Sequence, residues 1–261
     1  MTAFPVTLRS EWTKLASLRG TWIKVALALV LAVGMSALIA IVIGATWNDA
    51  SAADRAAFDP ARDALFGGIF SAIVFVVLGA TAATSEYTSG MIRLTLTATP
   101  RRGRVLAAKA AVVAAITLAA GLLANATMFL VAQAIFGSYG LQTASLTDGD
   151  ALRIVVADGL LAPVLALIAL ALGFALRSTA GAVTSVLGLI FLPGIFGTLL
   201  PAWWQDNVLD YLPGAAAEAI TSGHLEGATA TMAPALALVV LAGWLTVFLG
   251  GALAALQTRD A

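Results

Sequence analysis

The 261-residue sequence contains no cysteine and only one histidine, His224. Without cysteine the chain forms neither a disulfide framework nor a thiolate metal site, and a single histidine is a poor basis for a zinc site or an acid–base dyad. Charged residues are scarce, at 11% of the chain against about 25% in ordinary soluble domains. Hydrophobic residues make up 61%, so the composition indicates a membrane protein rather than a soluble enzyme.

Further absences narrow the functional classes. No lysine follows a glycine, so the G-x-x-x-x-G-K-[ST] signature of a nucleotide-binding P-loop is missing. The apolar segments contain no chain of acidic residues, the usual relay of a proton- or sodium-driven carrier. The net charge is zero, and no basic face exceeds what membrane topology requires, so no nucleic-acid partner is predicted. A transport function would therefore need an energy source outside this chain.

Six long hydrophobic segments dominate what is present. Each has about 20 residues or more, enough for a helix to cross a hydrocarbon core about 30 Å thick. Continuous apolar runs without alternation favour helices over a membrane β-barrel. We predict an all-α membrane protein with six transmembrane helices. The segments are residues 22–46, 65–85, 110–136, 154–176, 180–200 and 233–256.

The basic residues give the predicted orientation. When the six segments are threaded through a bilayer, eleven of the fourteen lysines and arginines fall on one side, and only Arg55, Arg62 and Arg153 fall on the other. Basic residues in short loops mark the cytoplasmic side. We therefore expect both termini to be cytoplasmic and the loops after the first, third and fifth segments to face outward.

Residues 1–21 are predicted to form an amphipathic helix along the cytoplasmic membrane surface. Hydrophobic residues recur every three or four positions, whereas Arg9, Lys14 and Ser17 fall on the opposite side. Such a helix could be an anchor that sets the angle of the first span, or a lever that contacts a cytoplasmic partner. The hydrophobic positions are Phe4, Leu8, Trp12, Leu15, Leu18 and Trp22.

The cytoplasmic stretch 86–109 is the richest in charge. A short helix or extended piece is expected over residues 91–99, halted by Pro100. Glu86 lies at the membrane exit, where a carboxylate is costly unless it is paired, and Arg93 or Arg19 is its expected partner. The basic residues of this stretch are Arg93, Arg101, Arg102, Arg104 and Lys109. On the outward side, residues 201–232 carry two prolines and several aromatics, which favours short re-entrant or interfacial helices.

Few polar residues lie within the spans. Asn125 and Gln133 fall on one face of the third segment, where they could form interhelical hydrogen bonds or line a substrate path. Asp158 lies one turn into the fourth segment, and we expect it to reach the outer membrane surface. Small residues spaced by four mark close helix contacts, within one subunit or between two. They are Ser36, Ala40 and Gly44 in the first segment, and Gly181 and Ser185 in the fifth.

Three stretches together resemble a known family. They are LRSEWTKLASLRGTW (8–22), SEYTSGMIRLTLTATPRRGRVLAAK (85–109) and YLPGAAAEAI (211–220). In this order and topology they are similar to the motifs of ABC-2-type transporter permeases, in the form common in actinobacteria. Met91 departs from the family's frequent threonine, and Ala215 from its small polar residue.

The resemblance implies a single transmembrane domain over residues 1–261, in a bacterial plasma membrane, that is not itself an enzyme. It implies a second permease copy or a paralogue, and two P-loop ATPase subunits that bind ATP and Mg. Spans one and five would form the dimer interface. The first helix and the loop after span two would contact the ATPase. Candidate coupling residues in these two regions are Arg9, Glu11, Lys14, Glu86, Arg93, Arg101, Arg102 and Arg104.

The expected function is export of a hydrophobic or amphipathic substrate such as a drug, an antibiotic, a lipid or a peptide. The alternative is a membrane scaffold or sensor subunit that transports nothing, which would have no ATPase partner. A secondary carrier is a third possibility, disfavoured by the missing acidic relay.

Overall fold

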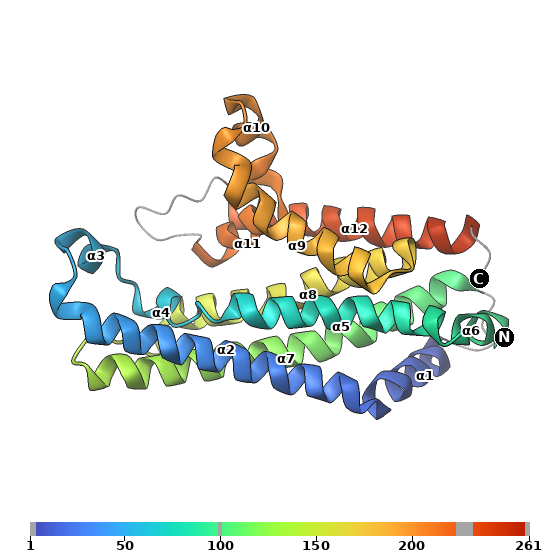
Figure 1. Ribbon diagram of the computed structural model, residues 1–261, viewed down its shortest axis with the longest axis horizontal. Coiled ribbons are helices and arrows are strands. Elements are labelled where there is room, and N and C mark those ends of the chain that lie inside the picture. The colour runs from blue at the N-terminus through green and yellow to red at the C-terminus, as the bar shows by residue number, and fades with distance from the viewer. Residues whose placement is uncertain (1–3, 99–100, 223–231, 259–261) are drawn as a thin grey trace.

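The computed structural model describes residues 4–98, 101–222 and 232–258, and every element in these ranges is a helix (Figure 1). Six helices are long and apolar enough to cross a membrane. They are α2 (Arg19–Thr46), α5 (Gly68–Thr88), α7 (Arg102–Ser138), α8 (Gly149–Leu176), α9 (Thr179–Phe196) and α12 (Pro234–Thr258). The predicted all-α fold with six spans is therefore confirmed.

Shorter helices connect the spans or precede them. The remaining elements are α1 (Phe4–Ser17), the 3-10 turn η1 (Trp47–Asp49), α3 (Ala52–Ala57), α4 (Pro60–Asp63), α6 (Met91–Ala98), η2 (Gly197–Leu199), α10 (Ala202–Asn207), η3 (Leu209–Tyr211) and α11 (Pro213–Ser222). The predicted piece after Glu86 is thus the helix α6. The predicted stop at Pro100 and the histidine His224 lie outside the described residues.

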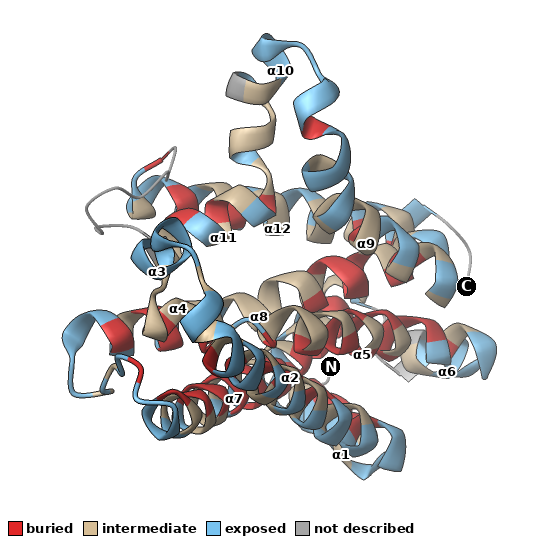
Figure 2. Ribbon diagram, turned by 60° about the vertical axis from the view of Figure 1, so that its left-hand side comes forward, coloured by how far each residue is buried: buried red, intermediate tan, exposed pale blue. Residues whose placement is uncertain are grey.

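Three helices form the centre of the bundle. About half or more of the most apolar stretch of α5, α7 and α8 is buried, at 56%, 61% and 50%, against 22% for α2 and 17% for both α9 and α12. Figure 2 shows this division, with buried residues gathered on the central helices. Helix α2 lies on one flank, and α9 and α12 lie on the other (Figure 1). The outer helices therefore leave broad apolar surfaces for lipid or for other membrane subunits.

Glycines allow the central helices to approach closely. A Cβ atom added to Gly79 of α5 would lie 2.0 Å from the carbonyl oxygen of Ala166 in α8, and one on Gly121 of α7 would lie 2.6 Å from the Cβ of Ala162. Both distances are too short for a side chain. Because lipid provides little hydrophobic drive for helix association, such close packing supplies much of the attraction between spans.

The small face of α2 packs inside the chain. Ser36 and Ala40 are fully buried, and the Ser36 hydroxyl donates to the carbonyl oxygen of Ala64 at 2.5 Å. Gly44 faces the ring of Tyr139. The prediction that Ser36, Ala40 and Gly44 line a dimer interface is therefore wrong, because their own chain already covers them. On α9, by contrast, Gly181 is half-buried and Ser185 is exposed, so a dimer role for that face stays a prediction.

The two ends of the bundle carry different elements. Helices α1 and α6 and the end of α12 lie at one end, and α3 lies at the other (Figure 1). Helix α10 stands out sideways from the bundle, with Trp203 and Trp204 exposed. Helix α11 returns to pack on α12 and α8. The pairing of α1 and α6 at one end sets up the charged cluster described next.

Candidate functional site

Four charged side chains meet where α1, α5 and α7 come together. Helix α1 buries one narrow face against the bundle, formed by Thr7, Glu11 and Leu15. Glu11 is only 1% exposed. Glu86 lies in the last turn of α5, and Lys109 lies seven residues beyond the first residue of α7. Both of these side chains are buried as well, while Lys14 of α1 is partly buried. We call Glu11, Lys14, Glu86 and Lys109 the ionic cluster.

Each lysine of the ionic cluster bridges both carboxylates. The Nζ of Lys109 lies 2.5 Å from Oε2 of Glu11 and 2.9 Å from Oε1 of Glu86. The Nζ of Lys14 lies 2.7 Å from Oε1 of Glu11 and 3.1 Å from Oε1 of Glu86. Two positive and two negative charges make the cluster neutral overall. Removal of any one member would therefore leave an uncompensated buried charge, which costs several kcal/mol.

The electrostatics of the cluster are reflected in the pKa of Lys14. Burial alone would lower the pKa of this amine, but the hydrogen bond to Glu11 and the negative charges of Glu86 and Glu11 outweigh it, so the pKa is raised above its ordinary value. Lys14 therefore stays protonated through the physiological range. Its ammonium group also donates to the hydroxyl of Thr95 in α6, at 3.1 Å. The cluster thus joins α1, α5, α6 and α7.

The structure corrects one pairing and adds one residue. Among the described residues, the ion partners of Glu86 are Lys14 and Lys109, so the prediction of Arg93 or Arg19 is wrong. Lys109 was absent from the predicted coupling residues, although it is central to the cluster. The signal for it was its place directly before a long run without any charged residue, where an ammonium group needs a partner.

The predicted coupling arginines lie around the cluster. Arg9, Arg93 and Arg101 are exposed, while Arg102 and Arg104 are half-buried. The guanidinium of Arg102 donates to the carbonyl oxygen of Leu256 and so links the start of α7 to the end of α12. This end of the bundle therefore combines a buried ionic core with an exposed basic rim.

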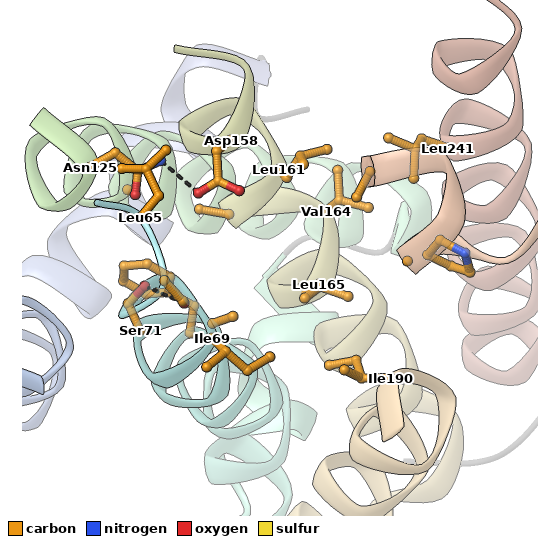
Figure 3. Close-up of a pocket in the computed structure, with 18 of the residues that line it drawn as sticks. Leu65, Ile69, Ser71, Asn125, Asp158, Leu161, Val164, Leu165, Ile190 and Leu241 are labelled. Atoms are coloured by element: carbon orange, nitrogen blue, oxygen red, sulfur yellow. Dashed lines mark hydrogen bonds between the residues drawn. The ribbon is translucent and has the colours of Figure 1, made fainter. Parts of the chain in front are cut away.

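A cavity of about 250 Å³ lies between the helices, apart from the ionic cluster. Its walls come from α5, α7, α8, α9, α11 and α12 and are mostly apolar. Figure 3 shows Asn125 and Asp158 together at one end, with Ile190 and Leu241 toward the other. The Nδ2 of Asn125 donates to Oδ2 of Asp158 at 2.8 Å and to the carbonyl oxygen of Val155 at 3.3 Å.

The structure separates the two polar residues predicted on one face of the third span. Asn125 lines the cavity, but Gln133 does not. The amide of Gln133 donates to the carbonyl oxygen of Pro60 at 2.6 Å and accepts from the backbone N–H of Ala144 at 2.8 Å. Gln133 thus holds together the two loops at the α3 end. Asp158 also lines the cavity. The sequence analysis expected it only to reach the outer membrane surface and did not predict this position.

A comparison with known families identifies the class of protein. The family model described as "ABC-2 family transporter protein" matches residues 7–195, most of the chain. The chain therefore belongs to this family, and it is a multi-pass membrane permease of an ABC transporter. The match spans all four residues of the ionic cluster and the Asn125–Asp158 pair. A search of curated proteins found no match.

Proposed function

We propose that the chain is the permease subunit of an ATP-driven exporter, which moves a hydrophobic or amphipathic substrate while separate P-loop ATPase subunits hydrolyse ATP. Membership of the ABC-2 family, whose permeases typically work with an ATPase partner, supports this assignment. The ionic cluster is the observation that carries it. A permease driven by another subunit needs a rigid connection from its docking surface to its spans.

The ionic cluster supplies such a connection. A push on α6 reaches α1 through the Lys14–Thr95 hydrogen bond. From Lys14 it reaches Glu86 of α5, and through Glu86 and Glu11 it reaches Lys109 of α7. Helices α5 and α7 belong to the buried centre of the bundle. Ion pairs in a low-dielectric site are stiff, because separation of the charges is costly.

The basic rim is the proposed docking surface for the ATPase. Arg9, Arg93 and Arg101 are exposed near the cluster and would face acidic residues of the partner. Their end of the bundle would be cytoplasmic by the distribution of basic residues, with both chain termini on that side of a plasma membrane. The exposed face of α9 with Ser185 would meet a second permease subunit.

Co-purification with a P-loop ATPase, sought first in the reading frames that neighbour the gene for this chain, tests the proposal. The wild-type pair should form a stable complex in lipid nanodiscs, and the permease should change the ATPase rate. Combined Arg9→Glu and Arg93→Glu changes should abolish that effect and leave the folded permease intact by size-exclusion chromatography. Arg55→Glu is the matched control, because Arg55 is an exposed arginine of α3 at the opposite end.

One result would overturn the proposed function, and a second would overturn only the proposed docking surface. Failure of the wild-type chain to bind an ATPase would favour the scaffold or sensor alternative. Normal ATPase coupling in the doubly reversed variant would show that the arginines only set the topology.

A further inference from the structure

The polar residues that line the cavity between the spans are few, and its only carboxylate among the described residues lies at one end (Figure 3). Of the described residues that line it, Asp158 is the only one with an ionisable side chain. Ser71, another polar residue in the wall, donates its hydroxyl to the carbonyl oxygen of Gly68 in its own helix. The rest of the wall is largely aliphatic, including Leu161, Leu165 and Leu241. The cavity is thus an apolar pocket with one acidic end.

Asp158 has no cationic partner within the described part of the chain. No lysine, arginine or histidine there lies within ion-pair distance of its carboxylate, and its one hydrogen bond comes from the Asn125 amide. It is also the only charged residue of α8 between Arg153 and Arg177. An acidic side chain inside a membrane bundle is expensive and is usually paired or functional. Because the Asp158 carboxylate lines the cavity, a cation bound there would supply the partner that it lacks within the described chain.

We propose that this cavity binds a lipophilic organic cation, with the ammonium group at Asp158 and the apolar body along Leu161, Leu165 and Leu241. The inference rests on the proposed function, because it names the chemical class of the exported substrate. The volume of about 250 Å³ suits a small amphipathic amine. Asn125 holds the carboxylate in place through the hydrogen bond between their side chains.

The charge of the nearby loops favours the same ligand. The loops that join the spans at the α3 end, together with the described part of the chain between α9 and α12, carry eight acidic and only two basic residues. A surface with one dominant sign of charge concentrates ions of the opposite sign. Helix α11 closes one side of the cavity with Pro213, Gly214 and Ala217. Its movement away from α8 and α12 would open a route between the cavity and these acidic loops.

A matched pair of probes tests the proposal on the full chain in phosphatidylcholine nanodiscs. Phenylbutylamine is an ammonium ion at neutral pH, and phenylbutanol is a neutral molecule of nearly the same shape. Calorimetric titrations, corrected with empty nanodiscs, should give an affinity for the amine about tenfold or more above that for the alcohol. Asp158→Asn should remove this preference by weakening the amine only.

Two further variants make the outcome decisive. Asp150→Asn removes an exposed carboxylate of the same helix outside the cavity, and the amine preference should remain. Ala217→Phe fills the cavity from α11 and should weaken both probes. Equal binding of amine and alcohol by the wild type would overturn the proposal. So would an unchanged amine preference in Asp158→Asn, or unchanged binding of both probes in Ala217→Phe.

The binding experiment separates this inference from the proposed function, since it involves neither ATP nor a partner. Amine binding without any ATPase partner would sustain the site and refute the exporter. An ATPase complex without amine selectivity would sustain the exporter and refute the cation site.

Discussion

The ammonium nitrogen of Lys109 lies 2.5 Å from a carboxylate oxygen of Glu11, although 98 residues separate the two in the sequence. Both side chains are 2% exposed. This contact fixes the first helix of the chain to the long central helix α7, next to the end of α5. This pair is one connection between α1 and the core of the bundle, beside the direct link from α1 to α2 and the buried side chain of Leu15.

Lys109→Met should destabilise the protein by about 3–5 kcal/mol, because it leaves the carboxylates of Glu11 and Glu86 short of a buried positive charge. The midpoint of thermal unfolding in detergent measures this loss. Lys24→Met is the control, since Lys24 is half-buried but forms no ion pair among the described residues. Equal midpoints for the two variants would contradict a stabilising role for the ionic cluster.

Lys14 makes part of the folding stability sensitive to high pH. Its pKa is raised in the folded state, so its contribution is complete below the ordinary value of 10.5 and is lost as the pH rises through the higher folded value. Unfolding midpoints measured from pH 7 to pH 11 should fall less in Lys14→Arg than in the wild type, because arginine stays charged. Parallel curves for the two proteins would refute this account.

Gly79→Ala should force α5 and α8 apart, because the added Cβ would lie 2.0 Å from the Ala166 carbonyl oxygen. We expect a loss of about 1–3 kcal/mol, as for other overpacked sites, measured by thermal unfolding in detergent. Gly250→Ala of α12 is the matched control, since nothing lies within 4 Å of its added Cβ. Equal stability of the two variants would mean that the α5–α8 contact tolerates extra volume.

Gln133→Leu should loosen the loops at the α3 end, because it removes hydrogen bonds to Pro60 and Ala144. Hydrogen exchange should become faster in residues 58–66 and 140–148, while the centre of the bundle is unaffected. Thr127→Val is the control on the same helix, since the Thr127 hydroxyl bonds only to Leu123 of α7 itself. Unchanged exchange in both loops would exclude this bridging role for Gln133.

Long apolar runs made the spans predictable, because each run has to satisfy its backbone hydrogen bonds within one helix. The contacts between spans were harder to predict. Small residues on α2 suggested a dimer face, yet they pack against their own chain, and a very close helix approach occurs at Gly79 of α5. Spacing along one helix reveals a small face but not which neighbour covers it.

The charged site was predicted only in part for a similar reason. Glu86 stood out because a carboxylate at a membrane exit needs a partner, but the expected partners were Arg93 and Arg19. The partners come instead from α1 and α7, which only the folded bundle brings together. Likewise, Asp158 gains its position in a cavity wall from α5, α7 and α11, which are distant in the sequence.

The pairing of Glu11 with Lys109 also bears on how the protein is made. At about 5–20 residues per second, the ribosome needs about 5–20 s to synthesise the 98 residues that follow Glu11. Through that interval Glu11 has Lys14 of its own helix as a partner but lacks Lys109. Helix α1 therefore cannot complete its contacts until α7 has been synthesised. Docking of α1 is then a late step, which follows insertion of the first three spans.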